Sequence, residues 1–227
     1  MKKILASAAV LAVAFASSAA HAQDAAGFEG AYVGVTVGGA QIDSTLTDAD
    51  EWFTYGAAQK SSGSLVYGAT AGYNVAVGSN GVIGLEADFS GSTGKNDIAD
   101  PDWESYLHQK VDWFSTVRAR AGLATGNALV YATGGVAFAR NDNQAYYDVA
   151  GCGNDQYDVC VKETKTSIVF GGGVEYKLSE KLSLKAEYLH LDGATARHQI
   201  PTTTSSYNNV VFKNNLNIAR IGFNYSF

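Results

Sequence analysis

The chain ends in Ala219-Arg-Ile-Gly-Phe-Asn-Tyr-Ser-Phe227, and this stretch decides the fold. Apolar residues stand at every second position, and the residues between them are polar or small. Alternation with period two is typical of a β-strand whose two faces have different surroundings. The segment therefore predicts a strand with one apolar, partly aromatic face and one polar face.

The same alternation recurs through the chain. The segment 65–75 places Tyr67 and Tyr73 on its apolar face and Gly68 and Gly72 on the other. Strands of this kind are expected in eight segments: residues 28–40, 65–75, 82–90, 111–124, 128–140, 166–178, 183–192 and 213–227. The fifth is the least regular. There we expect an outward face formed by Val130, Ala132, Val136 and Phe138, although the opposite face carries Leu129 and Tyr131.

The connections between these segments alternate in length. Residues 76–81, 125–127 and 179–181 are short and rich in Gly, Asn and Ser, as hairpin turns are. The other four connections, residues 41–64, 91–110, 141–165 and 193–212, are long. Short turns at one end and long loops at the other are typical of outer-membrane barrels. The pattern predicts an all-β fold, an eight-stranded antiparallel up-and-down transmembrane β-barrel, with both termini at the periplasmic end.

Charged residues on the polar faces distinguish this barrel from a soluble β-sandwich. A membrane barrel turns apolar residues to lipid and polar residues to its lumen. An eight-stranded barrel is so narrow that side chains fill it. Glycines share these faces with long charged side chains, which suits a narrow lumen where opposite charges pair. The barrel-interior charges are expected to be Glu86, Asp88, Arg118, Arg120, Glu175, Lys177, Lys185, Glu187 and Arg220.

The hairpin around Glu180 allows a prediction of strand register. With Glu180 at the middle of the turn, Glu175 stands opposite Lys185. A slip of two residues would set Glu175 against Glu187 and Lys177 against Lys185. Like charges directly opposite one another are destabilising. We therefore expect Glu175 and Lys185 to be cross-strand partners.

Aromatic residues gather near the ends of the predicted strands. Rings with an apolar body and a polar tip favour the headgroup level of a membrane. One predicted girdle lies near the short turns and the other near the long loops. The first contains Tyr73, Tyr176, Phe223, Tyr225 and Phe227, and the second Tyr67, Phe89, Trp113, Phe138 and Tyr188.

Composition excludes two classes of protein. The chain has 227 residues, of which 46% are hydrophobic and 17% charged, and its formal net charge is −6. A chain this apolar and weakly charged is not expected to be disordered. An acidic chain also lacks the basic surface that phosphate backbones require, so we expect no nucleic-acid partner.

Residues 1–22 have the features of a cleaved signal peptide. Lys2 and Lys3 precede a short apolar stretch that runs from Ile4 to Ala16. Ala20-His-Ala22 then fits the small-x-small cleavage rule. The apolar stretch is too short for the roughly 20 residues of a spanning helix. We expect residues 23–227 to form an exported barrel domain, with a net charge of −8 once the two lysines are removed.

These segments resemble the small outer-membrane β-barrel proteins of Gram-negative bacteria, which share their architecture with the barrel of outer-membrane protein A. The resemblance is carried by the C-terminal alternation, by Ala-Tyr-Val-Gly-Val-Thr-Val-Gly-Gly at 31–39 and by Leu-Lys-Ala-Glu-Tyr-Leu-His-Leu-Asp at 184–192. Members are often described as porin-like or immunogenic. The resemblance implies a location in the cell outer membrane. It also implies that Ile221, Phe223, Tyr225 and Phe227 form the signal read by the outer-membrane assembly machinery.

Candidate chemistry is sparse. Cys152 and Cys160 fall in one predicted loop of an exported protein, so a disulfide is expected between them. No zinc-binding His spacing and no Gly-x-Ser-x-Gly elbow occurs in the chain. We therefore expect no metal, no cofactor and no enzymatic activity.

The sequence favours a structural protein of the outer membrane. Such a protein would display four long extracellular loops, contribute to envelope integrity and take part in surface interaction. Its expected partners are outer-membrane lipid and lipopolysaccharide, the assembly machinery and a host or surface ligand of the loops. The alternative is a narrow porin-like passive channel for small solutes. Eight strands leave little lumen for it, whereas porins use 16–18.

Overall fold

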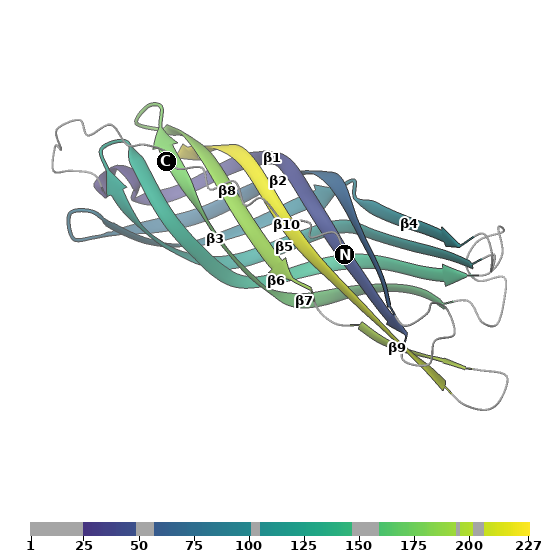
Figure 1. The fold of residues 1–227 in the computed structure, drawn as a ribbon. Helices are drawn as coiled ribbons and strands as arrows, with labels where there is room; N and C mark the ends of the chain where they lie inside the picture. The colour runs from purple at the N-terminus through teal and green to yellow at the C-terminus, as the bar shows by residue number, and fades with distance from the viewer. Residues whose placement is uncertain (1–24, 49–56, 101–104, 147–158, 194–195, 202–206) are drawn as a thin grey trace, which may run out of the picture.

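A computed structural model describes residues 25–48, 57–100, 105–146, 159–193, 196–201 and 207–227. Within these residues eight long strands form a closed antiparallel barrel (Figure 1). A single turn of 3-10 helix, η1 (Ala26–Phe28), precedes the first strand. The barrel strands are β1 (Gly30–Asp48), β2 (Ala57–Val77), β3 (Gly81–Ser92), β5 (Ser105–Thr125), β6 (Ala128–Tyr146), β7 (Val159–Lys177), β8 (Leu182–Asp192) and β10 (Tyr207–Ser226).

Neighbours in the chain are neighbours in the barrel. Each barrel strand pairs with the next, and β10 closes the cylinder by pairing with β1 from Tyr32↔Ser226 to Asp48↔Val210. Two short strands, β4 (Lys95–Asp100) and β9 (Ala196–Pro201), pair with β5 and β10 at the long-loop end. At the opposite end the tight turns place Gly78 and Gly126 at positive φ, which glycine adopts without steric cost. The predicted fold class is confirmed.

All eight predicted segments are strands, but most extend further toward the long-loop end than predicted. β2 begins at Ala57 rather than at residue 65, and β7 begins at Val159 rather than at residue 166. The ladders continue without a break through these extensions, which are rich in polar residues. Beyond the membrane neither face needs to be uniformly apolar, so the alternation fades while the backbone hydrogen bonds continue. The predicted loops were therefore too long.

The predicted register is confirmed. Glu175 lies opposite Lys185 in the β7–β8 ladder, and Glu187 lies opposite Gly173. The face assignment of the fifth segment is also correct. Val130, Val136 and Phe138 point outward, while Leu129 and Tyr131 are buried inside the barrel.

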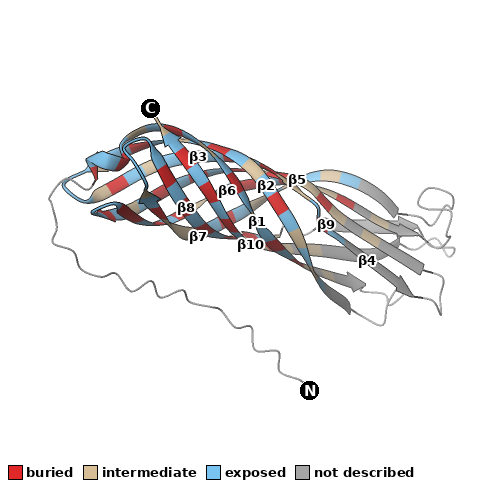
Figure 2. Cartoon of the chain, turned by 90° about the horizontal axis from the view of Figure 1, so that it is seen from above, coloured by how far each residue is buried: buried red, intermediate tan, exposed pale blue. Residues whose placement is uncertain are grey.

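Burial alternates along the described parts of the eight barrel strands, as the bands of Figure 2 show. Outward side chains are apolar and exposed, and they include Val35, Leu85, Leu123, Ile168 and Phe223. Many inward side chains are polar or charged and are buried. Among the described residues there is no helix of the length and apolar character that crossing a membrane requires.

Candidate functional site: the interior of the barrel

A cluster of charged side chains fills the middle of the lumen. Its members are inward-facing residues of β3, β5, β7, β8 and β10. Each member is at most 5% exposed. The cluster contains four carboxylates and four cationic groups, and its members are Glu86, Asp88, Arg118, Arg120, Glu175, Lys185, Glu187 and Arg220.

Arg118 is the centre of this cluster. Its guanidinium contacts the carboxylate of Glu86 and lies 3.0 Å from those of Asp88 and Glu187. Arg220 bridges two of the same acids from the other side, with nitrogen–oxygen distances of 3.1 Å to Asp88 and 2.6 Å to Glu187. These contacts connect β3, β5, β8 and β10 across the lumen, so the cluster restrains strands that are not neighbours.

Arg120 forms a second branch nearer the short turns. Its guanidinium donates to Asn74 at 2.8 Å and to Glu175 at 3.0 Å. The same group lies over the rings of Tyr32 and Tyr131, 4.6 and 5.2 Å from their centroids. Cation–π contacts of this kind strengthen when the cation is desolvated. Arg120 is therefore compensated by a carboxylate, an amide and two aromatic faces.

Glu175 and Lys185 are cross-strand partners, as predicted, but they do not form an ion pair with each other. Although Lys185 stands opposite Glu175, its ammonium group crosses the lumen and donates to Glu86 at 2.9 Å. Glu175 instead accepts from Arg120, and from Ser183 and Asn224. The sequence pattern places the residues correctly, but the narrow lumen brings partners from distant strands within reach.

Lys177 is the one predicted interior charge that lies outside this cluster. It is half-buried at the short-turn end, where its ammonium group donates to the Glu180 carbonyl at 3.0 Å. It also lies 5.4 Å from the ring centroid of Phe28. The strand alternation directs Lys177 inward, but its position at the end of β7 puts it at the rim of the barrel.

Apolar side chains close the lumen at both ends of the charge cluster, which the sequence reasoning missed. Toward the short turns, η1 is held by the Asn74 amide, which donates to the Phe28 carbonyl at 2.8 Å. This lower layer contains Ala25, Phe28, Val82, Ala124, Leu129 and Tyr131. The upper layer, toward the long loops, contains Ala40, Ile42, Val66, Val111, Phe114, Ala137, Ala139, Val169, Leu189, Leu191, Leu216 and Ile218.

Glycine makes room for the two tyrosines of the cluster. A Cβ atom built on Gly72 would collide with the phenol of Tyr32, and one on Gly173 would meet the Tyr131 hydroxyl at 2.7 Å. The Tyr32 hydroxyl donates to Glu86 at 2.7 Å and the Tyr131 hydroxyl donates to Glu187 at 3.0 Å. The excess of inward glycines thus allows large side chains to lie against the barrel wall.

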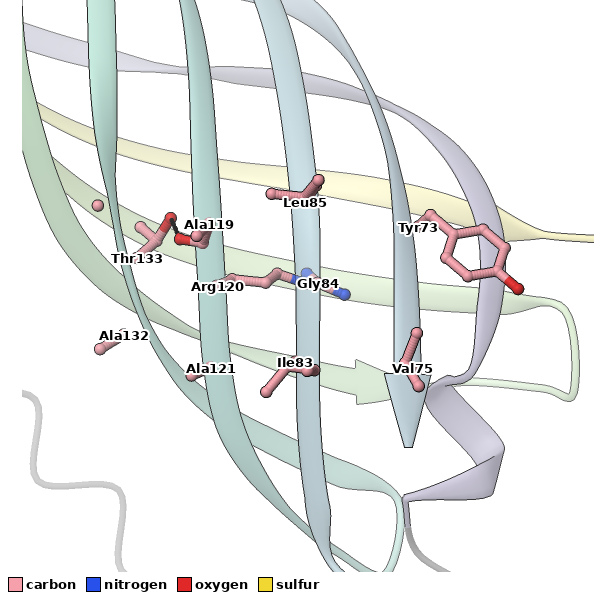
Figure 3. Close-up of a pocket in the computed structure, with 11 residues that line it drawn as sticks. Tyr73, Val75, Ile83, Gly84, Leu85, Ala119, Arg120, Ala121, Ala132 and Thr133 are labelled. Carbon is pink, nitrogen blue, oxygen red and sulfur yellow. Dashed lines mark hydrogen bonds between the residues drawn. The ribbon is translucent and has the colours of Figure 1, made fainter. Parts of the chain in front are cut away.

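The outer wall of the barrel carries a groove. Its volume is about 740 Å³, and small side chains of β5 and β6, such as Ala119, Ala121 and Ala132, form its floor. Tyr73 and Leu85 border it on the side of β2 and β3 (Figure 3). Apart from Arg120, Gly84 and Thr133, which belong to the inward face, the lining points to lipid.

The other candidate residues lie outside the charge cluster. Cys152 lies outside the described residues, and only the backbone of Cys160 is described, opposite Gln144 in the β6–β7 ladder. Within the described part of the chain, no group of three His, Cys, Asp or Glu side chains could hold a metal ion. Ile221, Phe223, Tyr225 and Phe227 point outward at the end of β10, with Tyr225 and Phe227 packed edge to face at 5.6 Å.

A closed barrel of eight antiparallel strands, with an apolar exterior and a charged interior, defines the class of transmembrane barrels of the outer membrane. Comparison with known proteins agrees: the chain belongs to the family of the outer membrane protein beta-barrel domain, which matches residues 8–227. It is an outer-membrane protein.

Two curated relatives carry the name 31 kDa outer-membrane immunogenic protein, one from Brucella melitensis biotype 1 and one from Brucella suis biovar 1. Each is 31% identical to this chain over 214 residues, which cover 90% of this chain and 85% of the relative. The crystal structure of the outer membrane protein OprG from Pseudomonas aeruginosa has the same fold. Its TM-score is 0.57 at 16% identity, and the match covers 88% of this chain and 96% of OprG.

Proposed function

We propose that this protein is a closed, structural barrel of the outer membrane that displays its four long connections at the cell surface. One observation carries the proposal. A charge-balanced cluster, from Glu86 on β3 to Arg220 on β10, fills the middle of the lumen between two apolar layers. Such an interior holds the strands together and leaves no continuous polar path for solutes.

The energetics favour a barrel that stays closed. Removing one partner from a buried ion pair typically costs about 3–5 kcal/mol, because a charge is left without compensation. A channel would have to separate Arg118 from three carboxylates and also displace Phe114 above and Phe28 below. The narrow porin-like channel therefore has no support from the interior.

The surface role rests on the extracellular ends of the strands. We propose that the connections there contact host or other surface ligands, while the apolar coat contacts outer-membrane lipid and lipopolysaccharide. The name of the Brucella relatives, an immunogenic outer-membrane protein, is consistent with a surface-exposed protein. Rigid scaffolds that carry variable loops are a common arrangement for recognition.

Replacing one connection at a time by a short Gly-Ser linker tests the surface role. The segments to replace are residues 49–56, 101–104, 147–158 and 202–206, which leaves all barrel strands intact. We expect at least one replacement to abolish binding of bacteria to host cells or of phage to bacteria, with unchanged amounts of folded barrel. Wild-type binding in all four variants would contradict the surface role and leave the structural role in place.

We further propose that residues 1–22 are removed on export and that the mature domain is 23–227. The small-x-small site ending at Ala22 supports this boundary. Sequencing the N-terminus of protein purified from outer membranes is expected to begin at Gln23. A mature protein that still begins at Met1 would contradict the proposal.

A further inference from the structure

A row of basic side chains crosses the outer face of the barrel at the long-loop end. Four residues of adjacent strands are direct cross-strand partners. Lys95 of β4 lies opposite Lys110 of β5, which lies opposite Asp142 of β6, and Asp142 lies opposite Lys162 of β7. Residues directly opposite in adjacent strands point to the same face. Arg140 lies two positions from Asp142 on that face, one row closer to the membrane. We call Lys95, Lys110, Arg140 and Lys162 the basic rung.

The basic rung is exposed and only partly neutralised. The side chains of Lys110 and Lys162 are 42% and 59% exposed, and each has one carboxylate partner, Asp112 at 2.7 Å and Asp142 at 2.9 Å. Arg140 is exposed, and no hydrogen bond or ion pair joins its side chain to another described residue. Among the described side chains of Lys110, Arg140 and Lys162, three cations stand against two carboxylates, which leaves a local excess of positive charge.

Asp142 contributes a permanent negative charge to this balance. Partial burial acts to raise the pKa of Asp142, but hydrogen bonds from Gln144 and Lys162 outweigh it and lower the pKa. Asp142 is therefore ionised near neutral pH, and its negative charge is included in the charge balance of the basic rung.

On the opposite side of the barrel, the described outward side chains at a similar height show no such excess. There the outward positions of β8, β10 and β1 carry Asp43, Asp192 and Lys213, and Lys213 lies 3.2 Å from Asp192. Asp43 accepts hydrogen bonds from Gln41 and Asn217 at 3.0 Å. Among the described side chains, the excess of positive charge therefore lies over β5–β7 and not over β8, β10 and β1.

Aromatic rings fix the height of the basic rung relative to the membrane. Phe89 and Trp113 stack at a centroid distance of 5.4 Å, and Trp113 stands directly opposite Arg140 in the β5–β6 ladder. Phe138, 37% exposed, comes next toward the lipid. Aromatic side chains of this kind mark the headgroup level. The cations just beyond them lie among the headgroups of the outer leaflet.

From this arrangement we propose that the basic rung is a binding site for the phosphate-bearing headgroup of an outer-leaflet lipid. Arg140 supplies a guanidinium fork suited to bidentate phosphate binding, and the lysines supply point charges on either side. The rung crosses three strand spacings, roughly 14 Å, which can accommodate a headgroup with more than one phosphate. The site rests on the proposed function only in one respect: the long-loop end of the barrel must face the outside of the cell. A barrel that conducts solutes could carry the same site.

Titration with diphosphorylated lipid A tests this site. The full-length protein, refolded in phosphatidylcholine nanodiscs, is compared as wild type, Arg140→Gln, Lys162→Gln and the double variant. We expect each substitution to weaken binding about five-fold, because each basic side chain near an anionic headgroup contributes a corresponding amount to the free energy of binding. Lys213→Gln is the matched control, since it also removes one ion-paired lysine from the rim, and its binding should stay within two-fold of wild type.

Two further arms separate a headgroup site from general adhesion. Lipid A stripped of both phosphates should lose the dependence on Arg140, and millimolar inorganic phosphate should compete only weakly. Equal weakening by Lys213→Gln, unchanged binding by the double variant, or full competition by inorganic phosphate would each overturn the proposal. Heat-modifiable gel mobility shows whether every variant has a folded barrel.

Discussion

At the scale of single residues, this barrel is characterised by buried charged side chains, which would be unfavourable in the interior of most proteins. Arg118 is fully buried, yet three carboxylates surround it. The desolvation penalty of such a group is offset only when its partners are complete. The alternation in the sequence predicted which charges point inward, and eight of the nine join the cluster, with Lys177 at the rim.

Comparing two arginines tests the value of these contacts. Arg118→Gln should lower the free energy of unfolding by about 3–5 kcal/mol, because Glu86, Asp88 and Glu187 lose a shared partner in a dry interior. Arg140→Gln, on the exposed face, should change it by less than about 0.5 kcal/mol. Urea titration of both variants in detergent micelles measures the difference. Equal effects would mean that the interior cluster contributes little to stability.

At the scale of strands, the sequence predicted the existence and faces of all eight barrel strands but not their lengths. Period-two patterning arises from the contrast between lipid and lumen, and it reports only the part of a strand that experiences this contrast. The extensions of β2 and β7 lie beyond it. The upper apolar layer was missed for a different reason. Apart from Ile42, its residues lie on predicted strands, but the inward faces of these strands were expected to be polar.

The last strand allows a prediction about assembly. We propose that the outward residues of β10 that end at Phe227 are read by the assembly machinery. Phe227→Ala should then reduce the amount of folded protein in outer membranes several-fold without changing the stability of protein refolded in vitro. Tyr176→Ala, which removes another lipid-facing ring near the same end, is the control. A similar loss for both variants would point to lipid anchoring instead of a signal.

The start of β7 is next to the proposed disulfide. If Cys152 and Cys160 are joined, protein purified without reductant and then unfolded should show no free thiol in a thiol titration. The closed segment is short, so reduction should lower the free energy of unfolding by less than about 3 kcal/mol. Detection of two free thiols would show that the cysteines are not paired.

At the scale of the whole molecule, charge and apolarity are distributed in the reverse of the soluble pattern. Many of the large apolar side chains form a coat toward lipid, while the centre of the lumen holds opposite charges in balance. Two apolar layers lie on either side of this centre, which supports the proposed role as a closed scaffold. Neither layer was predicted, since closing a lumen depends on side chains from distant strands meeting in space.

The central claim is that this lumen is closed, and single-channel recording in planar lipid bilayers tests it most directly. Wild-type protein, inserted from folded and homogeneous samples, should produce no lasting conductance above the bilayer baseline. Frequent, sustained openings of uniform size from the wild-type protein would contradict a closed scaffold and favour the narrow porin-like channel.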